Sequence, residues 1–296
     1  MNRTLAIILL SAAAVPAITG CSPDPSAPAD RDRPPERIVS LAPSITEMLF
    51  ALGLGSKVVG VSRFADYPPA VEDLPRVGGY VDPDYERILK LNPDLVCVVD
   101  TDAQGIEALR DLGLRVAALP HQDIEDIYRA LGKLGRIFGV PERAEALNRR
   151  LRERGKALTR AADGDERPAT LICISRRAGR GVPAEVIAIG PETFYHELLV
   201  RAGGRNVYEG SLRYPTLSYE SLVRLDPEVI IDVHPYGQSA AEIDTLRNDW
   251  EGADALTAVR RDRVYIYTAR HAAIPGPRFV KVLEDFVEMI HDDPHE

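Results

Sequence analysis

The sequence feature that most constrains the fold is a stretch of 16 residues that occurs twice. Tyr85–Asp100 (YERILKLNPDLVCVVD) returns 134 residues later as Tyr219–His234 (YESLVRLDPEVIIDVH). In each copy a short helical pattern ends before a proline, which lacks the N–H that a helix needs. An apolar run of strand length follows. The repeat therefore predicts two lobes of similar construction, each with a glutamate, Glu86 or Glu220, at the start of a helix.

The rest of the chain alternates between strand and helix patterns, which predicts an α/β fold. Alternation of this kind is typical of mostly parallel sheets covered by helices, so we expect two Rossmann-like lobes, residues 37–121 and 163–296, with a ligand cleft between them. Residues 122–162 carry a helical stripe and no strand pattern. They predict a long backbone helix that joins the lobes, in which Pro141 either introduces a kink or begins a second helix. Near the first strand, Ser44 and Glu47 have the spacing of a capping box.

The N-terminus predicts export and a lipid anchor. Residues 1–20 contain a short apolar run that ends in small residues before Cys21, the pattern of a lipoprotein signal peptide. Residues 21–36 are rich in proline and predict an extended tether. We therefore expect a membrane-anchored lipoprotein outside the cytoplasm, whose contact with the membrane is through the lipid alone. Cys97 and Cys173 lie in apolar strands and are expected to be buried free thiols.

Charge and motifs exclude several classes of function. The formal net charge of −9 argues against a nucleic-acid partner, because nucleic-acid-binding surfaces are basic. The sequence has no nucleophile elbow, zinc-protease motif, phosphate-binding loop or Cys-x-x-Cys pair. We expect neither an enzyme nor a resident cofactor or metal.

Several segments together resemble the periplasmic-binding family for iron chelates and cobalamin. They are RIVSLAPSITE from Arg37, DYPP from Asp66, the first copy of the repeat, AGGRNV from Ala202 and PGPRF from Pro275. The resemblance covers residues 37–291 and is strongest for the cobalamin-binding members. It implies the substrate-binding component of an ABC importer, with two α/β lobes joined by a backbone helix and a ligand between them.

The resemblance also implies partners. In this family one exposed glutamate on each lobe meets arginines of a permease dimer that carries its ATPase subunits, and Glu86 and Glu220 match those positions. A solvated pair of helix N-terminal glutamates is the alternative interpretation. We expect the binding protein itself to be a monomer.

Aromatic residues in loops predict the ligand site. Tyr80 and Tyr214 each lie six residues before the glutamate of their copy, so one ring from each lobe could close on a flat ligand. With Phe64, they match aromatic positions of cobalamin-binding relatives. Polar candidates follow strands of the second lobe: Arg176, Tyr236, Arg270 and His271. His271 or Tyr80 could coordinate the metal of a haem or corrinoid.

The ligand and the class of function stay open at this point. A corrinoid ranks first, a ferric siderophore second if Arg176, Arg177 and Arg270 converge in the cleft, and haem third. Two functions of another class are also compatible with two α/β lobes around a cleft: a ligand sensor and a secreted hydrolase. A hydrolase would need Ser175 as nucleophile with His234 or His271 as base.

Overall fold

The computed structural model describes residues 33–164, 166–236 and 238–292. All of these except Arg33 belong to one compact unit that begins at Pro34. The predicted signal peptide, Cys21 and nearly all of the predicted tether lie outside the described residues. No helix among the described residues is long and apolar enough to cross a membrane.

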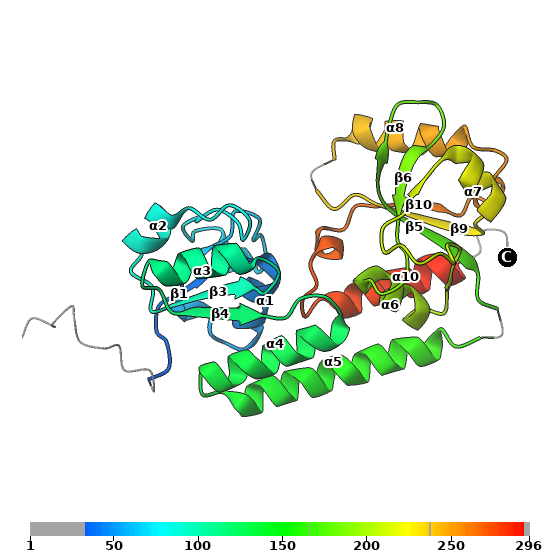
Figure 1. Ribbon diagram of the computed structural model, residues 1–296. Coiled ribbons are helices and arrows are strands. Elements are labelled where there is room, and N and C mark those ends of the chain that lie inside the picture. Colours follow the sequence, from blue (N-terminus) through cyan, green and yellow to red (C-terminus); the bar gives the residue numbers. More distant parts are fainter. Residues whose placement is uncertain (1–32, 165, 237, 293–296) are drawn as a thin grey trace, which may run out of the picture. The chain divides into compact units, whose positions relative to one another are not determined.

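The first lobe is built on a four-stranded parallel sheet, as the alternating pattern predicted (Figure 1). Its strand order is β2-β1-β3-β4. The elements are β1 (Ile38–Ser40), α1 (Pro43–Ala51), β2 (Val58–Val61), α2 (Tyr85–Lys90), β3 (Leu95–Val99), α3 (Ala103–Asp111) and β4 (Val116–Leu119), with short 3-10 turns at Gly55–Lys57 and Pro69–Val71. All five residues of β3 are buried, which explains its continuous apolar sequence.

The second lobe has a larger, mixed sheet of order β10-β9-β5-β6-β8, with β7 also paired to β5. The strands β10, β9, β5 and β7 run parallel, whereas β6 is antiparallel to both β5 and β8. The elements are β5 (Ala169–Arg177), β6 (Ala184–Ala188), α6 (Phe194–Arg201), β7 (Arg205–Asn206), β8 (Thr216–Leu217), α7 (Tyr219–Leu225), β9 (Val229–Val233), α8 (Ala240–Glu251), α9 (Thr257–Arg260), β10 (Val264–Tyr267), the 3-10 turn η3 (Arg270–Ala273) and α10 (Phe279–His291).

The connection between the lobes is a pair of helices and not a single rod. Helix α4 spans Ile124–Ile137, and α5 begins with Pro141 at its first position and runs to Ala161. Figure 1 shows the two helices side by side. They are antiparallel, because Asn148 Nδ2 donates to the carbonyl of Tyr128 at 3.0 Å while Ala144 packs on Gly135 near the connecting turn. Pro141 therefore starts a second helix, one of the two alternatives that the sequence left open.

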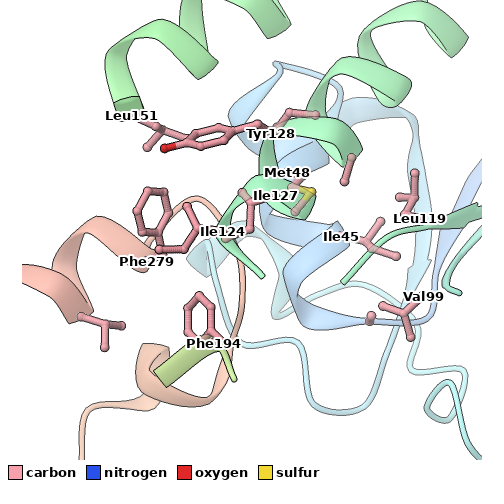
Figure 2. Packing of buried hydrophobic residues seen from close by; sticks show 14 of the residues in the cluster. Ile45, Met48, Val99, Leu119, Ile124, Ile127, Tyr128, Leu151, Phe194 and Phe279 are labelled. Atoms are coloured by element: carbon pink, nitrogen blue, oxygen red, sulfur yellow. The ribbon is translucent and has the colours of Figure 1, made fainter. Parts of the chain in front are cut away.

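One hydrophobic core runs through both lobes and the helix pair. It contains residues from α1, from α4 and α5, and from α6 and α10. Figure 2 shows Phe279 of α10 near Tyr128 of α4, and their rings meet edge to face with centroids 6.1 Å apart. Because this core is continuous, the helix pair holds the two lobes by buried apolar packing as well as by chain connection.

The start of α1 differs from the sequence-based prediction of a capping box. The N-cap residue is Ala42, without a side-chain cap, and Pro43 occupies the first turn. Since Pro43 fixes where the helix begins, Ser44 falls inside it and cannot cap it. Glu47, the other half of the predicted box, is buried and forms two hydrogen bonds with Arg278 of the second lobe, at 3.0 and 2.5 Å.

Candidate ligand-binding cleft

Two adjoining pockets lie between residues of the first and second lobes. The first has a volume of about 300 Å³ and is lined by Ala42, Pro43, Ser44, Phe64, Tyr80, His121, Tyr236, Ala273, Ile274 and Pro275. The second has a volume of about 520 Å³ and is lined by Thr101, His121, Gln122, Ile174, Phe194, Tyr195, Arg213, Tyr214, Ala272, Ala273 and Pro275. His121, Ala273 and Pro275 line both, so the pockets form one cleft. Its size falls within the usual range for small-molecule sites.

The cleft lies where strands end. Ala42 follows β1, Phe64 follows β2, His121 follows β4 and Tyr236 follows β9. In α/β sheets the loops at the carboxyl ends of the strands commonly carry the ligand site, because those loops converge at one edge. The fold therefore brings together residues that are far apart in the sequence.

Aromatic side chains from both lobes line the first pocket. Phe64, Tyr80 and Tyr236 are 49%, 38% and 58% exposed, which is high for such large apolar rings. Burial and the neighbouring Tyr80 raise the pKa of Tyr236, so the Tyr236 hydroxyl stays protonated at neutral pH. Three large rings that are open to solvent offer a surface for a flat apolar ligand.

The second pocket contains the other predicted ring, Tyr214, which is 53% exposed. Tyr80 and Tyr214 thus line neighbouring pockets, and the ring from the second lobe that shares a pocket with Tyr80 is Tyr236 and not Tyr214. Tyr195 forms part of the wall, and its hydroxyl donates to the carbonyl of Ala272 at 2.8 Å. Burial raises the pKa of Tyr195, which keeps the phenol neutral.

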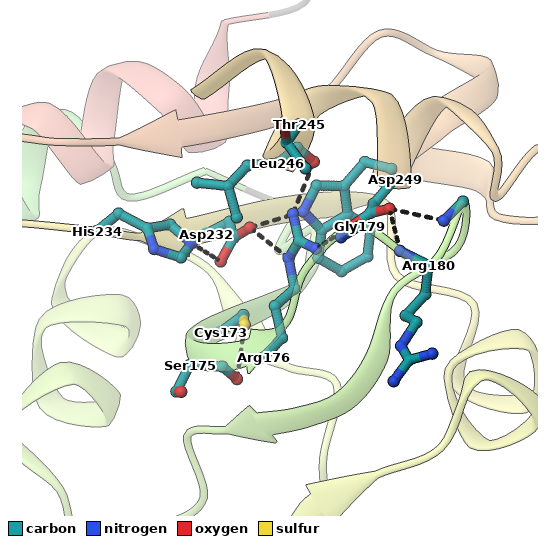
Figure 3. A network of polar contacts seen from close by, with 12 residues as sticks. Cys173, Ser175, Arg176, Gly179, Arg180, Asp232, His234, Thr245, Leu246 and Asp249 are labelled. Carbon is teal, nitrogen blue, oxygen red and sulfur yellow. Dashed lines mark hydrogen bonds and ion pairs between the residues drawn. The ribbon is translucent and has the colours of Figure 1, made fainter. Parts of the chain in front are cut away.

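Arg176 does not reach the cleft, and we withdraw it from the predicted ligand site. Its side chain is fully buried inside the second lobe. It donates to Asp232 at 2.8 Å, to Asp249 at 2.8 Å and to the carbonyl of Leu246 at 2.6 Å (Figure 3). Asp249 also accepts hydrogen bonds from the backbone N–H groups of Gly179, Arg180 and Gly181. Arg176 therefore fixes the loop after β5.

Arg270 and His271 lie in η3 beside the cleft, but neither lines the two pockets. Arg270 forms an ion pair with Asp66 of the first lobe. His271 Nε2 lies 3.2 Å from Asp285 and 3.3 Å from the hydroxyl of Tyr267. Both side chains thus have partners within the protein. The role of Arg270 and His271 in ligand binding stays a prediction.

The sequence analysis missed several cleft residues, among them His121 and Arg213. His121 lines both pockets, and Arg213 contributes a guanidinium to the second pocket, 6.0 Å from the ring of Tyr214. His121 could have been identified from its position, because it follows the strand Val116–Leu119 after a single proline, Pro120. Arg213 lies in an irregular loop, which gave no such signal.

The two repeated glutamates occupy equivalent positions. Glu86 and Glu220 are each the second residue of a short helix, after the capping residues Asp84 and Ser218. Both are exposed. Glu86 contacts Lys90 at 2.5 Å. A backbone hydrogen bond and the Ser218 hydroxyl lower the pKa of Glu220, which is therefore ionised at neutral pH.

The residues required for a hydrolase are not assembled. His234 Nε2 lies 2.8 Å from Asp232, which already accepts from Arg176 and from the indole of Trp250. Ser175 forms no side-chain hydrogen bond with a histidine among the residues that the structure describes. In the same residues no three His, Cys, Asp or Glu side chains gather in a way that could hold a metal ion.

The two remaining cysteines are free and buried, as predicted. Burial raises the pKa of Cys97 to about 12, and it raises the pKa of Cys173 as well. Both thiols are therefore protonated and unreactive at neutral pH.

The chain is similar in sequence and in structure to substrate-binding proteins of the periplasmic binding protein family. The sequence pattern of the periplasmic binding protein family matches residues 38–271. An uncharacterized ABC transporter substrate-binding lipoprotein of Bacillus subtilis is 28% identical over 88% of this chain and 81% of its own. The structure of the periplasmic vitamin B12 binding protein of Vibrio cholerae superposes with a TM-score of 0.73, at 26% identity over 87% of this chain and 97% of its own. A periplasmic heme binding protein of Pseudomonas aeruginosa gives a TM-score of 0.73, at 28% identity over 87% of this chain and 93% of its own.

Proposed function

Because the chain belongs to the periplasmic binding protein family, we propose that it captures a metal chelate outside the cytoplasm and delivers it to an ABC importer. It binds its substrate and does not transform it. The proposed cargo is cobalamin or another corrinoid. The observation that carries this choice is the aromatic lining of the cleft, where Phe64, Tyr80 and Tyr236 are exposed in the first pocket and Tyr214 in the second.

The arginines favour a macrocycle over a ferric siderophore. A siderophore site was expected if Arg176, Arg177 and Arg270 converged in the cleft. Arg176 is buried, Arg177 pairs with Glu185 at 3.0 Å and Arg270 pairs with Asp66, so none of the three is directed into either pocket. Arg213 lines the second pocket and suits one carboxylate or phosphate at the edge of a largely apolar ligand.

Haem is the second candidate. Like a corrinoid it is a flat macrocycle, and the relative from Pseudomonas aeruginosa with the same fold is a heme binding protein. Tyr80 and His121 are side chains of the types that coordinate haem iron, and both line the first pocket. Both macrocycles are flat and would pack against the same aromatic side chains, so binding measurements must decide between them.

Delivery is proposed to use Glu86 and Glu220. The two carboxylates are exposed and equivalently placed on α2 and α7, one on each lobe. Such an arrangement suits arginines on the two related subunits of a permease dimer. Exposed pairs of this kind contribute only about 0–1 kcal/mol each, so they set orientation and association rate more than affinity.

Membrane attachment is proposed to use a lipid on Cys21. The B. subtilis relative carries the word lipoprotein in its name, which agrees with the sequence pattern around Cys21. A tether of residues 21–36 would let the binding unit, which begins at Pro34, search for its permease while staying at the membrane.

The proposed cargo is tested by calorimetric titration with cyanocobalamin, haemin and a ferric hydroxamate. We expect one-to-one binding of the corrinoid. Binding of haemin alone would replace the corrinoid by haem, whereas binding of the ferric hydroxamate alone would contradict the argument from the aromatic lining.

A further inference from the structure

His121 lines both pockets of the cleft. It lies two residues after β4 and shortly before α4, at the point where the chain leaves the first lobe. It is one of three residues that line both pockets, and the other two, Ala273 and Pro275, offer no side-chain donor atom. A ligand that fills the cleft would therefore meet the imidazole at the junction between the pockets.

The imidazole has no hydrogen-bonding partner among the residues that the structure describes. Neither of its ring nitrogens takes part in a hydrogen bond with any described residue. Among those residues the fully buried side-chain polar atoms without a partner are Asn148 Oδ1, Thr159 Oγ1 and Arg263 Nε, so neither ring nitrogen of His121 is fully buried. The contrast with His234 and His271, which are both hydrogen-bonded to aspartates, is clear.

The surroundings keep the imidazole neutral. Burial lowers the pKa of His121, and this effect outweighs Asp100 and Asp126, the charged groups near it, which act in the opposite direction. Asp126 is itself occupied by the backbone N–H of Gln122 at 2.7 Å and by Arg129. A neutral imidazole presents a lone pair, and it is a good donor to cobalt or iron.

We infer that His121 coordinates the metal of the transported macrocycle at an exchangeable axial position. This inference rests on the proposed function. In the step, a nitrogen–metal bond forms and the bond from the metal to an axial water breaks; the water leaves and the metal keeps its oxidation state. A cargo with this property is a corrinoid or haem with an open axial position, because a ferric hydroxamate that saturates its iron has no position for the imidazole.

The test compares corrinoids with open and with blocked axial positions. Diaquacobinamide and haemin are titrated into the full chain, into His121→Ala and into the control His291→Ala, whose imidazole lies 2.9 Å from the carbonyl of Ala202 outside the cleft. Visible absorption reports the axial ligand directly. We expect an imidazole-bound spectrum for the unmodified chain and the control, and its absence for His121→Ala.

The affinities give a second readout. Loss of a direct ligand should weaken binding of diaquacobinamide at least as much as loss of an outer-shell partner does, by about 10- to 100-fold. Dicyanocobinamide, whose axial positions are occupied by cyanide, should bind both chains equally. Free imidazole should restore the imidazole-bound spectrum to His121→Ala, which separates a lost ligand from a damaged fold.

Two outcomes overturn the inference in different ways. If a macrocycle binds with the same spectrum and affinity to the unmodified chain and to His121→Ala, the coordination is refuted while the proposed function stands. If neither macrocycle binds the unmodified chain and a ferric hydroxamate does, both the proposed cargo and the coordination are refuted.

Discussion

Replacing Arg278 with Met would leave Glu47 without its partner in the contact between the lobes. The two side chains are only 16% and 3% exposed, and Arg278 also lies 4.1 Å over the ring of Tyr67. Burial raises the pKa of Glu47 even with Arg278 present. Without the guanidinium, the folded protein must either keep an unpaired buried carboxylate or protonate it.

Protonation sets an upper limit on the cost of the unpaired carboxylate. A glutamate with an ordinary pKa of about 4.3 needs about 4 kcal/mol to be protonated at pH 7, and about 1 kcal/mol at pH 5. Breaking a buried ion pair typically costs about 3–5 kcal/mol, in agreement with the limit at pH 7. We therefore expect Arg278→Met to lower the free energy of unfolding by about 3–4 kcal/mol at pH 7 and by about 1 kcal/mol at pH 5.

The direction of this pH dependence follows from linkage. In the variant the pKa of Glu47 is higher in the folded state than in the unfolded state, so the unfolded state releases the proton first. Stability is then lost as the pH rises from about 4 toward the folded-state pKa. The unmodified chain, in which Arg278 stabilises the ionised form, should show a weaker dependence over the same range.

Urea denaturation followed by circular dichroism at pH 5 and pH 7 measures both effects. Arg110→Met is the matched control, because it removes an ion pair with Glu107 whose side chains are 48% and 63% exposed. This control should cost less than about 1 kcal/mol at either pH. A cost for Arg278→Met that matches the control, or that is the same at both pH values, would refute the reasoning.

Three further predictions concern other parts of the chain. Reversing the charge of Glu86 and Glu220 should leave cargo affinity unchanged but impair uptake by cells, whereas uptake that matches a Glu107→Arg control would remove the docking role. Asp232→Asn should cost about 3–5 kcal/mol in urea denaturation at pH 7, because it leaves Arg176 partly unpaired. Hydrogen bonds from His234 and Trp250 and the charge of Arg176 outweigh burial and lower the pKa of Asp232, so this cost should shrink as the pH falls below about 4; a constant cost would contradict the assignment. Cys21→Ser should release the protein from the membrane fraction, and its retention there would argue against the lipid anchor.

Local patterns were sufficient to predict much of the fold. The helix in each copy of the repeat has its own capping residue, Asp84 or Ser218. The strand after it was recognised by its apolar run, and the structure buries all of its residues. The alternation of such units predicted the mostly parallel sheets. The antiparallel strands β6 and β8 were not predicted as such, because strand direction depends on pairing and not on composition.

The candidate site was harder to predict, because the partners of its polar residues are distant in the sequence. Arg176 looked available for a ligand, but Asp232 and Asp249 lie 56 and 73 residues away and take up its hydrogen bonds. Glu47 looked like a capping residue, and its true partner is 231 residues away. The aromatic residues were easier to recognise, since Tyr80 and Tyr214 share the spacing of the repeat, although the structure places them in adjoining pockets.

The central claim is that the aromatic cleft between the lobes binds the macrocycle, and the affinities of ring-deleted variants test it most directly. Titration calorimetry of Tyr80→Ala and Tyr214→Ala with the bound macrocycle should show losses on the order of 2 kcal/mol or more for each ring, as for anchors of an interface. Tyr208→Ala, which removes a ring of the second lobe outside the cleft, should bind normally. Unchanged affinity in both cleft variants would contradict the claim.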